Sequence, residues 1–253
     1  MLILIDLGNT SATAGIFKGL KIVSSNRFVY DNFPKNIYKW IKSGGCKLNS
    51  AIYCSVNPKY SSKLTHVLSQ ILPKKSISEL KNSRIPVKNR YNIPGQAGID
   101  RLINVYGGGK LYGNPCLVID IGTAITFDLG GPGNTFEGGL IFSGPNLAFD
   151  SLQQRTAKIG NFPLDFPKKR TLVGRSTREC VVEGVAYGYG HLIRGVIGEF
   201  RAYARKRWGR KLNVVVTGGY VNVIKPFLSK ADHTDKFLTL KAMARLYGER
   251  KKL

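Results

Sequence analysis

The sequence predicts a mixed α/β protein built from two similar halves. Apolar strands alternate with segments of helical spacing, which is typical of sheets flanked by helices. In addition, the run CLVIDIG at 116–122 repeats LILIDLG at 2–8, so that Asp6 aligns with Asp120 and Gly8 with Gly122. A repeat over about half the chain indicates duplication of a domain-sized unit. Chance similarity of two strand-turn-strand units is the alternative.

In the first half, β-rich runs come before segments with helical periodicity. Ile37, Trp40 and Ile41 form the stripe of the first helix. The expected order is strands at 2–6, 12–17 and 21–30, a helix at 35–44, a strand at 50–56, a helix at 61–72 and a short strand at 75–80.

Turn residues place the boundary between the halves. The run YGGGKLYGNP at 106–115 is rich in glycine, so we expect a lobe at 1–110 and a second at 111–253.

The second half continues with strands over 116–131 and 134–143 and a helix from about Leu147. Ser176 and Glu179 form a possible capping box that opens a helical segment over 179–207. Five glycines in this segment are costly in a helix, and close helix packing is the expected reason for them. A strand over 212–220 follows.

Composition excludes several classes of protein. With 43% apolar and 21% charged residues, the chain is globular in type. No apolar run approaches a membrane span, and Asp6 interrupts the first apolar stretch, so we expect a cytoplasmic protein. The cysteines form no C-x-x-C pair and are expected to be mostly buried thiols, and the histidines lack metal-ligand spacing.

The net charge of +24 is unusual for a globular chain of this size. Basic residues gather at 167–170, 201–211 and 249–253, yet no nucleic-acid-binding motif accompanies them. We expect a solvated basic surface, with nucleic acid bound only non-specifically, if at all.

Three apolar strands end in turns suited to phosphate, at 6–10, 120–123 and 217–219. Glycine lets the backbone approach a phosphate, and an aspartate at a strand end can hold Mg²⁺. A single such turn is equally compatible with an ordinary hairpin. Three in a duplicated chain favour a nucleotide held between two lobes, although none is a P-loop.

Asp100 and Arg101 follow Gly98 at the start of a predicted helix. They are compatible with a simple cap and ion pair. In a kinase, the carboxylate could take the proton of an attacking hydroxyl, and the guanidinium could clamp an anionic group.

Taken together, these motifs resemble a family of kinases. The chain is similar to type III pantothenate kinases, of the acetate and sugar kinase/Hsp70/actin superfamily, over nearly its whole length. The motifs in order are Asp6-x-Gly8-Asn9-Thr10, Tyr91-x-x-Pro94, Gly98-x-Asp100-Arg101, Asp120-x-Gly122-Thr123-Ala124 with Thr126, Gly138-Gly139 with Gly144-Pro145, Arg155-Thr156-Ala157-Lys158, Ser176-Thr177 and Thr217-Gly218-Gly219. Ile99 departs from the pattern, which usually has a small residue there.

The resemblance implies two duplicated ribonuclease H-like lobes of the actin-like ATPase fold, and ATP-dependent phosphorylation of pantothenate as the first step of coenzyme A synthesis. It implies Asp100 as general base, Arg101 on the pantothenate carboxylate, and a homodimer. Mg²⁺ near Asp6 and a monovalent cation, K⁺ or NH₄⁺, on Asp120 are the implied metals. The implied ATP contacts are Asp6, Leu7, Gly8, Asn9, Thr10, Ser11, Ala12, Thr13 and Thr123, and the implied pantothenate contacts are Tyr91, Gly98, Ile99, Asp100, Arg101 and Thr177.

Two alternatives remain open at this point. Another small-molecule kinase of the superfamily would act on a different alcohol. A non-catalytic relative with a regulatory or nucleic-acid-binding role would fit the net charge, but it would have no need of Asp6, Asp100, Arg101 and Asp120 together.

Overall fold

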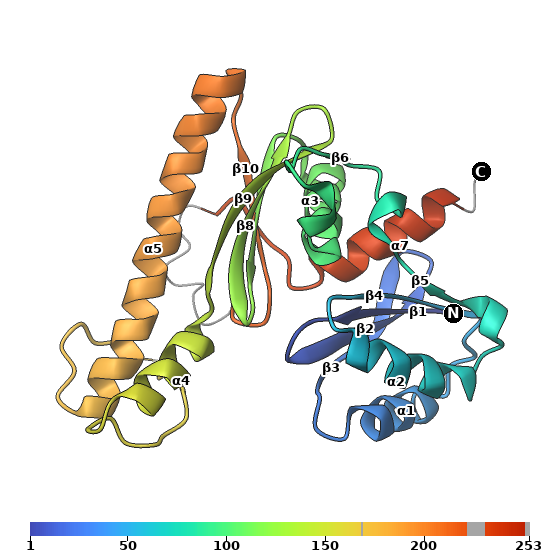
Figure 1. Ribbon diagram of the computed structural model, residues 1–253, viewed down its shortest axis with the longest axis horizontal. Coiled ribbons are helices and arrows are strands. Elements are labelled where there is room, and N and C mark those ends of the chain that lie inside the picture. The colour runs from blue at the N-terminus through green and yellow to red at the C-terminus, as the bar shows by residue number, and fades with distance from the viewer. Residues whose placement is uncertain (168, 222–230, 251–253) are drawn as a thin grey trace. The chain divides into compact units, whose positions relative to one another are not determined.

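The computed structural model of the 253-residue chain describes residues 1–167, 169–221 and 231–250. It divides into two compact units, each built around its own sheet (Figure 1). Unit 1 comprises Met1–Leu111, Asn134–Phe136 and Phe237–Leu253, and unit 2 comprises Tyr112–Gly133 and Glu137–Lys236. The expected lobes were 1–110 and 111–253. The last segment is grouped with unit 1 because its helix packs on the first sheet.

Unit 1 holds a five-stranded sheet in the order β3-β2-β1-β4-β5. β1 is antiparallel to β2 and parallel to β4, and β4 is parallel to β5. The strands are β1 (Leu2–Leu7), β2 (Ser11–Lys18), β3 (Lys21–Val29), β4 (Ser50–Ser55) and β5 (Ile77–Glu79). All five strands expected in this half are therefore present.

Helices α1 (Phe33–Ser43) and α2 (Pro58–Ser69) cover one face of this sheet. Ile3, Ile5 and Leu7 of β1 point into a core with Phe33, Ile37 and Ile41 of α1. Trp40, expected in the apolar stripe of α1, lies only partly buried at the edge of that core. Each of the two helices has a proline within its first two positions, where a missing N–H costs nothing.

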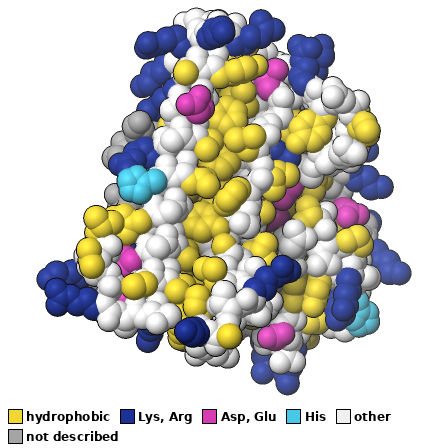
Figure 2. Space-filling model, turned by 60° about the vertical axis from the view of Figure 1, so that its left-hand side comes forward, with side chains coloured by type: hydrophobic (Ala, Val, Ile, Leu, Met, Phe, Trp, Pro, Cys, Tyr) yellow, Lys and Arg dark blue, Asp and Glu magenta, His cyan; other side chains and the backbone are white. Residues whose placement is uncertain are grey.

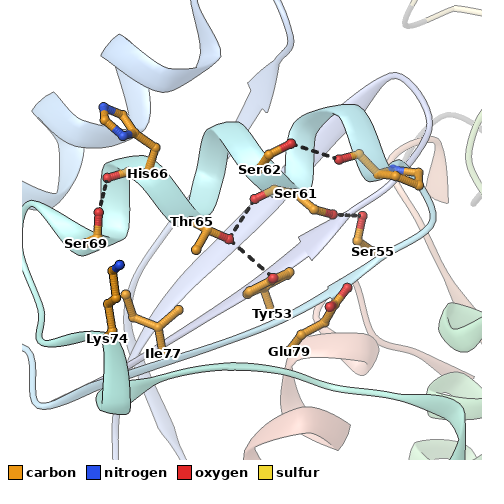
Figure 3. Close-up of a pocket in the computed structure, with 11 residues that line it drawn as sticks. Tyr53, Ser55, Ser61, Ser62, Thr65, His66, Ser69, Lys74, Ile77 and Glu79 are labelled. Carbon is orange, nitrogen blue, oxygen red and sulfur yellow. Dashed lines mark hydrogen bonds between the residues drawn. The ribbon is translucent and has the colours of Figure 1, made fainter.

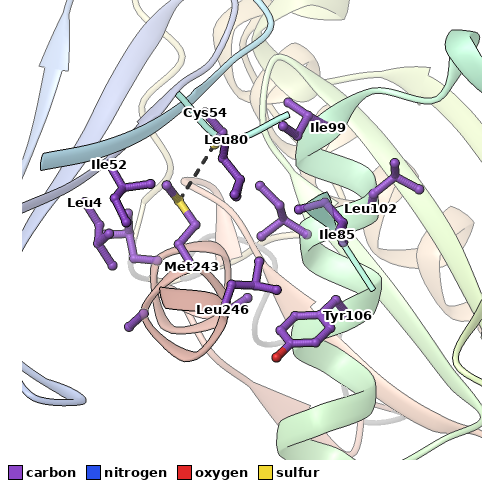
Figure 4. Close-up of a cluster of buried hydrophobic side chains, with 14 of the residues drawn as sticks. Leu4, Ile52, Cys54, Leu80, Ile85, Ile99, Leu102, Tyr106, Met243 and Leu246 are labelled. Atoms are coloured by element: carbon purple, nitrogen blue, oxygen red, sulfur yellow. Dashed lines mark hydrogen bonds between the residues drawn. The ribbon is translucent and has the colours of Figure 1, made fainter. Parts of the chain in front are cut away.

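Helices α3 (Ile99–Tyr112) and α7 (Leu238–Arg250) pack on the other face (Figure 4). Leu4, Ile52 and Cys54 meet Leu102, Tyr106 and Met243 there. The turn expected at 106–115 is wrong over its first half, because α3 runs through Gly107–Gly109. A Cβ on Gly107 would lie 2.7 Å from Ala242 Cβ, so the glycine allows α3 to approach α7 closely. Helix α7 has no counterpart among the elements expected from the sequence.

Unit 2 repeats the strand order of unit 1. Its strands run β9-β8-β7-β10-β11, with β7 antiparallel to β8 and parallel to β10, and β10 parallel to β11. The strands are β7 (Cys116–Ile121), β8 (Ala124–Gly131), β9 (Thr135–Ser143), β10 (Asn213–Thr217) and β11 (His233–Thr234). β7 also has the same pattern of buried and half-buried residues as β1. The repeat detected in the sequence is therefore a repeat of structure.

Helices α4 (Pro145–Arg155) and α5 (Thr177–Trp208) pack on one face of the second sheet. The capping box at the start of α5 is confirmed in part: Ser176 Oγ accepts from Glu179 N at 3.2 Å, but Glu179 Oε2 accepts from Arg175 N instead of Ser176 N. α5 is one unbroken helix. Packing within the chain does not explain four of its five glycines, since a Cβ on Gly184, Gly188, Gly195 or Gly198 would meet no described atom within 4 Å.

The remaining elements are short. They are the 3₁₀ turns η1 (Lys74–Ser76), η2 (Asn82–Arg84) and η3 (Pro94–Gln96), and strand β6 (Lys88–Asn89), which pairs with Thr135 and Phe136 of unit 1. All four cysteines are free thiols, although only Cys54 and Cys116 are buried. Among the described helices, none combines the length and the apolar character that crossing a bilayer requires.

Candidate active site

A row of four polar side chains crosses the sheet of unit 1. The strand register sets Asp6 of β1 opposite Cys54 of β4 on one side and Thr13 of β2 on the other, and Thr13 lies opposite Arg27 of β3. Directly opposed residues of neighbouring strands share a face of the sheet. Asp6 has the parity of Leu2 and Leu4, so the row lies on the face that carries α3 and α7. This row therefore brings together four polar groups on that face of the sheet: a thiol, a carboxylate, a hydroxyl and a guanidinium.

The surroundings of Asp6 in this row disfavour its ionised form. Burial, and to a lesser extent the nearby charge of Asp100, raise the pKa of its carboxyl to about 7. A hydrogen bond from Cys54 Sγ to Asp6 Oδ1 at 3.3 Å and the charge of Arg27 act the other way. A buried carboxyl group with a second carboxylate nearby forms a site that a cation would stabilise.

The turn after Asp6 is held by its own backbone and by three side chains. Gly8 N donates to Ser11 O at 3.0 Å, and Tyr30 Oη donates to Gly8 O at 2.5 Å. Arg27 Nε donates to Ser11 Oγ at 3.0 Å, and Asn57 Nδ2 donates to Asn9 O at 3.3 Å. The turn is therefore preorganised by groups from β3 and from the segment between β4 and α2.

The predicted phosphate-binding residues differ in what they can offer. Asn9 and Thr10 are exposed, and Ser11 and Thr13 are half-buried. The side chains of Leu7 and Ala12 are fully buried in the core between β1, β2, α1 and α2. Those two residues could therefore contact a nucleotide only through their backbone.

Asp100 and Arg101 occupy the first turn of α3. Asp100 Oδ1 accepts from Arg101 N at 2.9 Å, so the carboxylate caps the start of its own helix. Burial raises the pKa of Asp100, while that hydrogen bond and the positive charge of Arg101 lower it in part. The influence of Asp100 on the pKa of Asp6 places the two carboxyl groups in one electrostatic environment.

Arg101 is only 5% exposed, and aromatic groups surround its guanidinium. Arg101 Nη1 donates to Tyr91 Oη at 2.6 Å, and the guanidinium carbon lies 5.7 Å from the Tyr91 ring centre and 5.3 Å from that of Phe136. The structure thus brings together Tyr91 and Arg101, two residues of the predicted pantothenate site. Such packing fixes the orientation of the guanidinium fork.

The other two residues of the Gly98–Arg101 segment have mainly structural surroundings. Leu102 N donates to Gly98 O at 3.3 Å, so the carbonyl of Gly98, the residue before α3, accepts the first hydrogen bond of the helix. The Ile99 side chain is buried in the core with Leu102 and Ile103. A larger residue at this position therefore fills the core of unit 1.

Unit 2 contains a second row on β7 and its neighbours. Asp120 lies opposite Thr126 of β8 and opposite Thr217 of β10. Gly122 N donates to Ala124 O at 3.0 Å, in the same way that Gly8 N bonds to Ser11 O. The two Asp-x-Gly turns are therefore built alike, with threonine at the place that Cys54 occupies in unit 1.

The turns of unit 2 that the sequence singled out meet around Asp120. Gly144 N donates to Thr123 O at 2.8 Å. Gly218 has φ +103°, and a Cβ there would lie 2.5 Å from both Asp120 Oδ1 and Ile121 O. Asp120, Thr123 and the Thr217-Gly218 turn thus form one cluster. Thr177 is exposed in the first turn of α5.

A separate pocket of about 750 Å³ opens in unit 1 between α2 and the strands β4 and β5 (Figure 3). Hydroxyl groups line most of it, and none of the residues predicted for the site is among them. Ser61 Oγ donates to Ser55 Oγ at 2.7 Å, and Thr65 Oγ1 donates to Tyr53 Oη at 3.3 Å. These bonds fix the start of α2 next to Asn57, which supports the phosphate turn.

Four residues of this site were not predicted from the sequence. Cys54, Arg27, Asn57 and Phe136 come from strands and loops far along the chain from the groups that they contact. Cys54 and Arg27 could have been predicted only from the register of the strands, because that register places them in one row with Asp6.

Comparisons with known proteins show which family this chain resembles. A family model described as type III pantothenate kinase matches residues 2–199. The type III pantothenate kinase of Persephonella marina is 32% identical over 259 residues, which cover 98% of each chain.

Two solved structures share the fold. A conserved Baf family protein of Campylobacter jejuni has a TM-score of 0.65 at 19% identity and covers 99% of this chain and 100% of its own. Component A of the (R)-2-hydroxyglutaryl-CoA dehydratase of Acidaminococcus fermentans has a TM-score of 0.51 at 16% identity and covers 99% of this chain and 98% of its own. The mixed α/β, actin-like fold expected from the sequence is confirmed. By the family match and the identity over its length, this chain belongs to the type III pantothenate kinase family, and it is a kinase.

Proposed function

We propose that this enzyme transfers the γ-phosphoryl group of ATP to the primary hydroxyl of pantothenate, giving 4′-phosphopantothenate for coenzyme A synthesis. The observation that carries the proposal is that the Asp100 carboxylate and the buried, oriented guanidinium of Arg101 occupy consecutive positions at the start of α3, in the same unit as Asp6. We expect the reaction to take place in the cytoplasm.

Asp100 is the proposed general base. A carboxylate in reach of the attacking hydroxyl contributes about 10²- to 10⁴-fold to the rate. Arg101 would bind the pantothenate carboxylate, and Tyr91 and Phe136 keep its guanidinium in one orientation. Thr177 is proposed as a further pantothenate contact.

The triphosphate is assigned to residues 6–13 and to Thr123. The backbone of the turn and the hydroxyls of Thr10, Ser11 and Thr13 offer donors to phosphate oxygens. Kinase chemistry of this class needs a divalent metal, and the carboxyl groups of Asp6 and Asp100 fit one, because burial disfavours their ionised forms and a bound cation would favour them. We propose Mg²⁺ held by Asp6, and bound Mg²⁺ neutralises charge on phosphate oxygens.

A monovalent cation, K⁺ or NH₄⁺, is proposed at Asp120. Thr126 of β8 and Thr217 of β10 lie opposite Asp120, and Ile121 O lies close to the same turn at Gly218, so oxygen atoms gather around the Asp120 carboxylate. Oxygen donors suit hard cations of low charge.

We also propose that the enzyme is a homodimer formed through unit 2. Leu140, Ile141 and Phe142 are three consecutive apolar residues of β9, each about half exposed. Gly184, Gly188, Gly195 and Gly198 present an open face of α5 to a neighbour. Figure 2 shows hydrophobic side chains gathered beside α5 on this side of the molecule. Apolar patches of this kind typically mark protein interfaces.

A product assay tests the proposed reaction. The purified protein with ATP, Mg²⁺ and K⁺ is incubated with pantothenate and with a panel of other small alcohols, and phosphorylated products are identified by mass spectrometry. We expect 4′-phosphopantothenate as the main product and less of it when Na⁺ replaces K⁺. Turnover of another alcohol with none of pantothenate would contradict the substrate assignment.

A further inference from the structure

A pocket of about 690 Å³ lies at the C-terminal end of α5 in unit 2. It is lined by Arg201, Ala202, Arg205, Lys206, Gly209, Arg210, Lys211 and Leu212, which belong to the basic run at 201–211 together with Leu212. Figure 2 shows Lys and Arg side chains gathered at the upper end of the molecule, where α5 ends. None of these residues belongs to the turns assigned to ATP.

Five of the eight lining residues are cationic, and their charge is poorly balanced. Arg201 Nη2 pairs with Asp232 Oδ2 at 2.9 Å, and the same carboxylate oxygen accepts from Val214 N at 2.9 Å. Over the part of the chain that the structure describes, no ion pair is found for Arg205, Lys206, Arg210 or Lys211. The pocket therefore concentrates positive charge with one acidic partner.

The end of the helix keeps these charges together. Arg201 and Arg205 are four residues apart on α5, a spacing at which like charges repel. Gly209 adopts φ +63° and donates from its N to Arg205 O at 2.9 Å, which ends the helix and turns the chain. Arg210 and Lys211 thereby line the same pocket as the last turn of α5. A bound anion would relieve the repulsion.

We propose that this pocket binds a small oligophosphate anion. Arginine forks match phosphate oxygens bidentately, and a cavity of this volume suits a small molecule. No aromatic side chain lines the pocket, so a ligand is recognised through its phosphates and not by base stacking. The oligophosphate is either free or carried on a nucleotide. This site is independent of the proposed kinase reaction.

Titration calorimetry with inorganic tripolyphosphate, on the full chain in low salt without divalent metal, tests the proposal. The double variant Arg205→Gln/Arg210→Gln removes two cations of the pocket. The matched control, Lys35→Gln/Lys39→Gln, removes two exposed cations four residues apart on α1 and reaches the same net charge. Binding at the phosphate turns of unit 1 is common to all three proteins, so it cancels in the comparison.

We expect the pocket variant to lose one binding site or to bind tripolyphosphate at least tenfold more weakly, and the control to stay within twofold of the wild type. Kinase activity of the pocket variant should stay at the wild-type level, which shows that it is folded. A second ATP site that is lost in the pocket variant would identify a nucleotide-borne source, and a single ATP site would identify a free oligophosphate. Equal losses in both double variants, or no loss in the pocket variant, would overturn the proposal.

Discussion

Cys54 and Asp6 lie directly opposite each other on the parallel strands β4 and β1, and the Cys54 thiol donates a hydrogen bond to Asp6 Oδ1 at 3.3 Å. On its other side, Cys54 Sγ lies 3.8 Å from Met243 Sδ of α7, which Figure 4 shows. The carboxylate assigned to the metal is thus held by a group that is itself fixed in the core.

Removing this hydrogen bond is expected to weaken metal binding at Asp6. In Cys54→Val the volume is nearly kept and the donor is lost, and a net hydrogen bond is worth about 0.5–1.5 kcal/mol. The Mg²⁺ concentration for half-maximal activity should therefore rise roughly 2- to 10-fold. Activity measured against Mg²⁺ concentration gives this value.

Two control variants accompany this measurement. Cys54→Ser keeps a donor and should stay within about twofold of the wild type. Cys116→Val alters the other buried thiol, which lies on β7 away from the Asp6 row, and should leave the Mg²⁺ dependence unchanged. Equal effects of Cys54→Val and Cys116→Val would show that loss of a buried thiol, and not of the bond to Asp6, is the cause.

The raised pKa of Asp6 predicts that this residue lowers the free energy of unfolding at high pH. Folding raises this pKa from 3.8 to about 7, so the folded chain holds the proton more tightly than the unfolded chain. The resulting stabilisation is present below about pH 4 and is lost as the pH rises through 7. Because the side chain is half-buried, we expect Asp6→Asn to raise the free energy of unfolding by roughly 1–2 kcal/mol at pH 8, without metal, and little at pH 4.

Urea unfolding in the presence of a chelator at pH 4, 6 and 8 measures this difference. A variant that is less stable than the wild type at pH 8 would mean that ionised Asp6 is well compensated in the fold.

The two Asp-x-Gly turns illustrate which parts of the site can be predicted from the sequence. Asp6 and Asp120 could be found because each follows a continuous apolar strand, a local signal that is repeated along the chain. The pairing of Asp6 with Cys54 could not be found, because it depends on the register between strands 48 residues apart. The local sequence around Cys54 predicts only that its side chain is buried.

Tertiary packing overrode local preference in α3 and α7. Gly107–Gly109 have low helix propensity and were predicted as a turn, yet Gly107 lies against Ala242 in a helix pair. Helix α7 buries Leu238, Leu240, Ala242, Met243 and Leu246, which surround much of its circumference. A helix buried on most sides has no amphipathic stripe to detect.

Gly218 should tolerate no side chain. An alanine there would combine φ +103° with contacts of 2.5 Å to Asp120 and Ile121, so we expect Gly218→Ala to lower the free energy of unfolding by about 2–4 kcal/mol. Stimulation by K⁺ should also be lost. Gly248→Ala, at an open position of α7, is the matched control and should raise stability by up to about 1 kcal/mol. Similar thermal denaturation of the two variants would contradict the arrangement around Asp120.

The dimer proposal predicts a change of mass on mutation of β9. Ile141 is 62% exposed between Leu140 and Phe142, so Ile141→Asp should cost the monomer little and place a charge in the interface. Light scattering after size exclusion should give about 56 kDa for the wild type, twice the mass of one 27.9 kDa chain, and half of that for the variant. Lys39→Asp on α1 should remain dimeric. A wild-type monomer would refute the proposal.

The most direct test of the central claim is the turnover number of Asp100→Asn with pantothenate. Asparagine keeps the size and an acceptor oxygen for Arg101 N, but it cannot take a proton. We predict that kcat falls by about 10²- to 10⁴-fold while calorimetry shows pantothenate bound within a few-fold of the wild-type affinity. A kcat near that of the wild type would show that Asp100 is not the base.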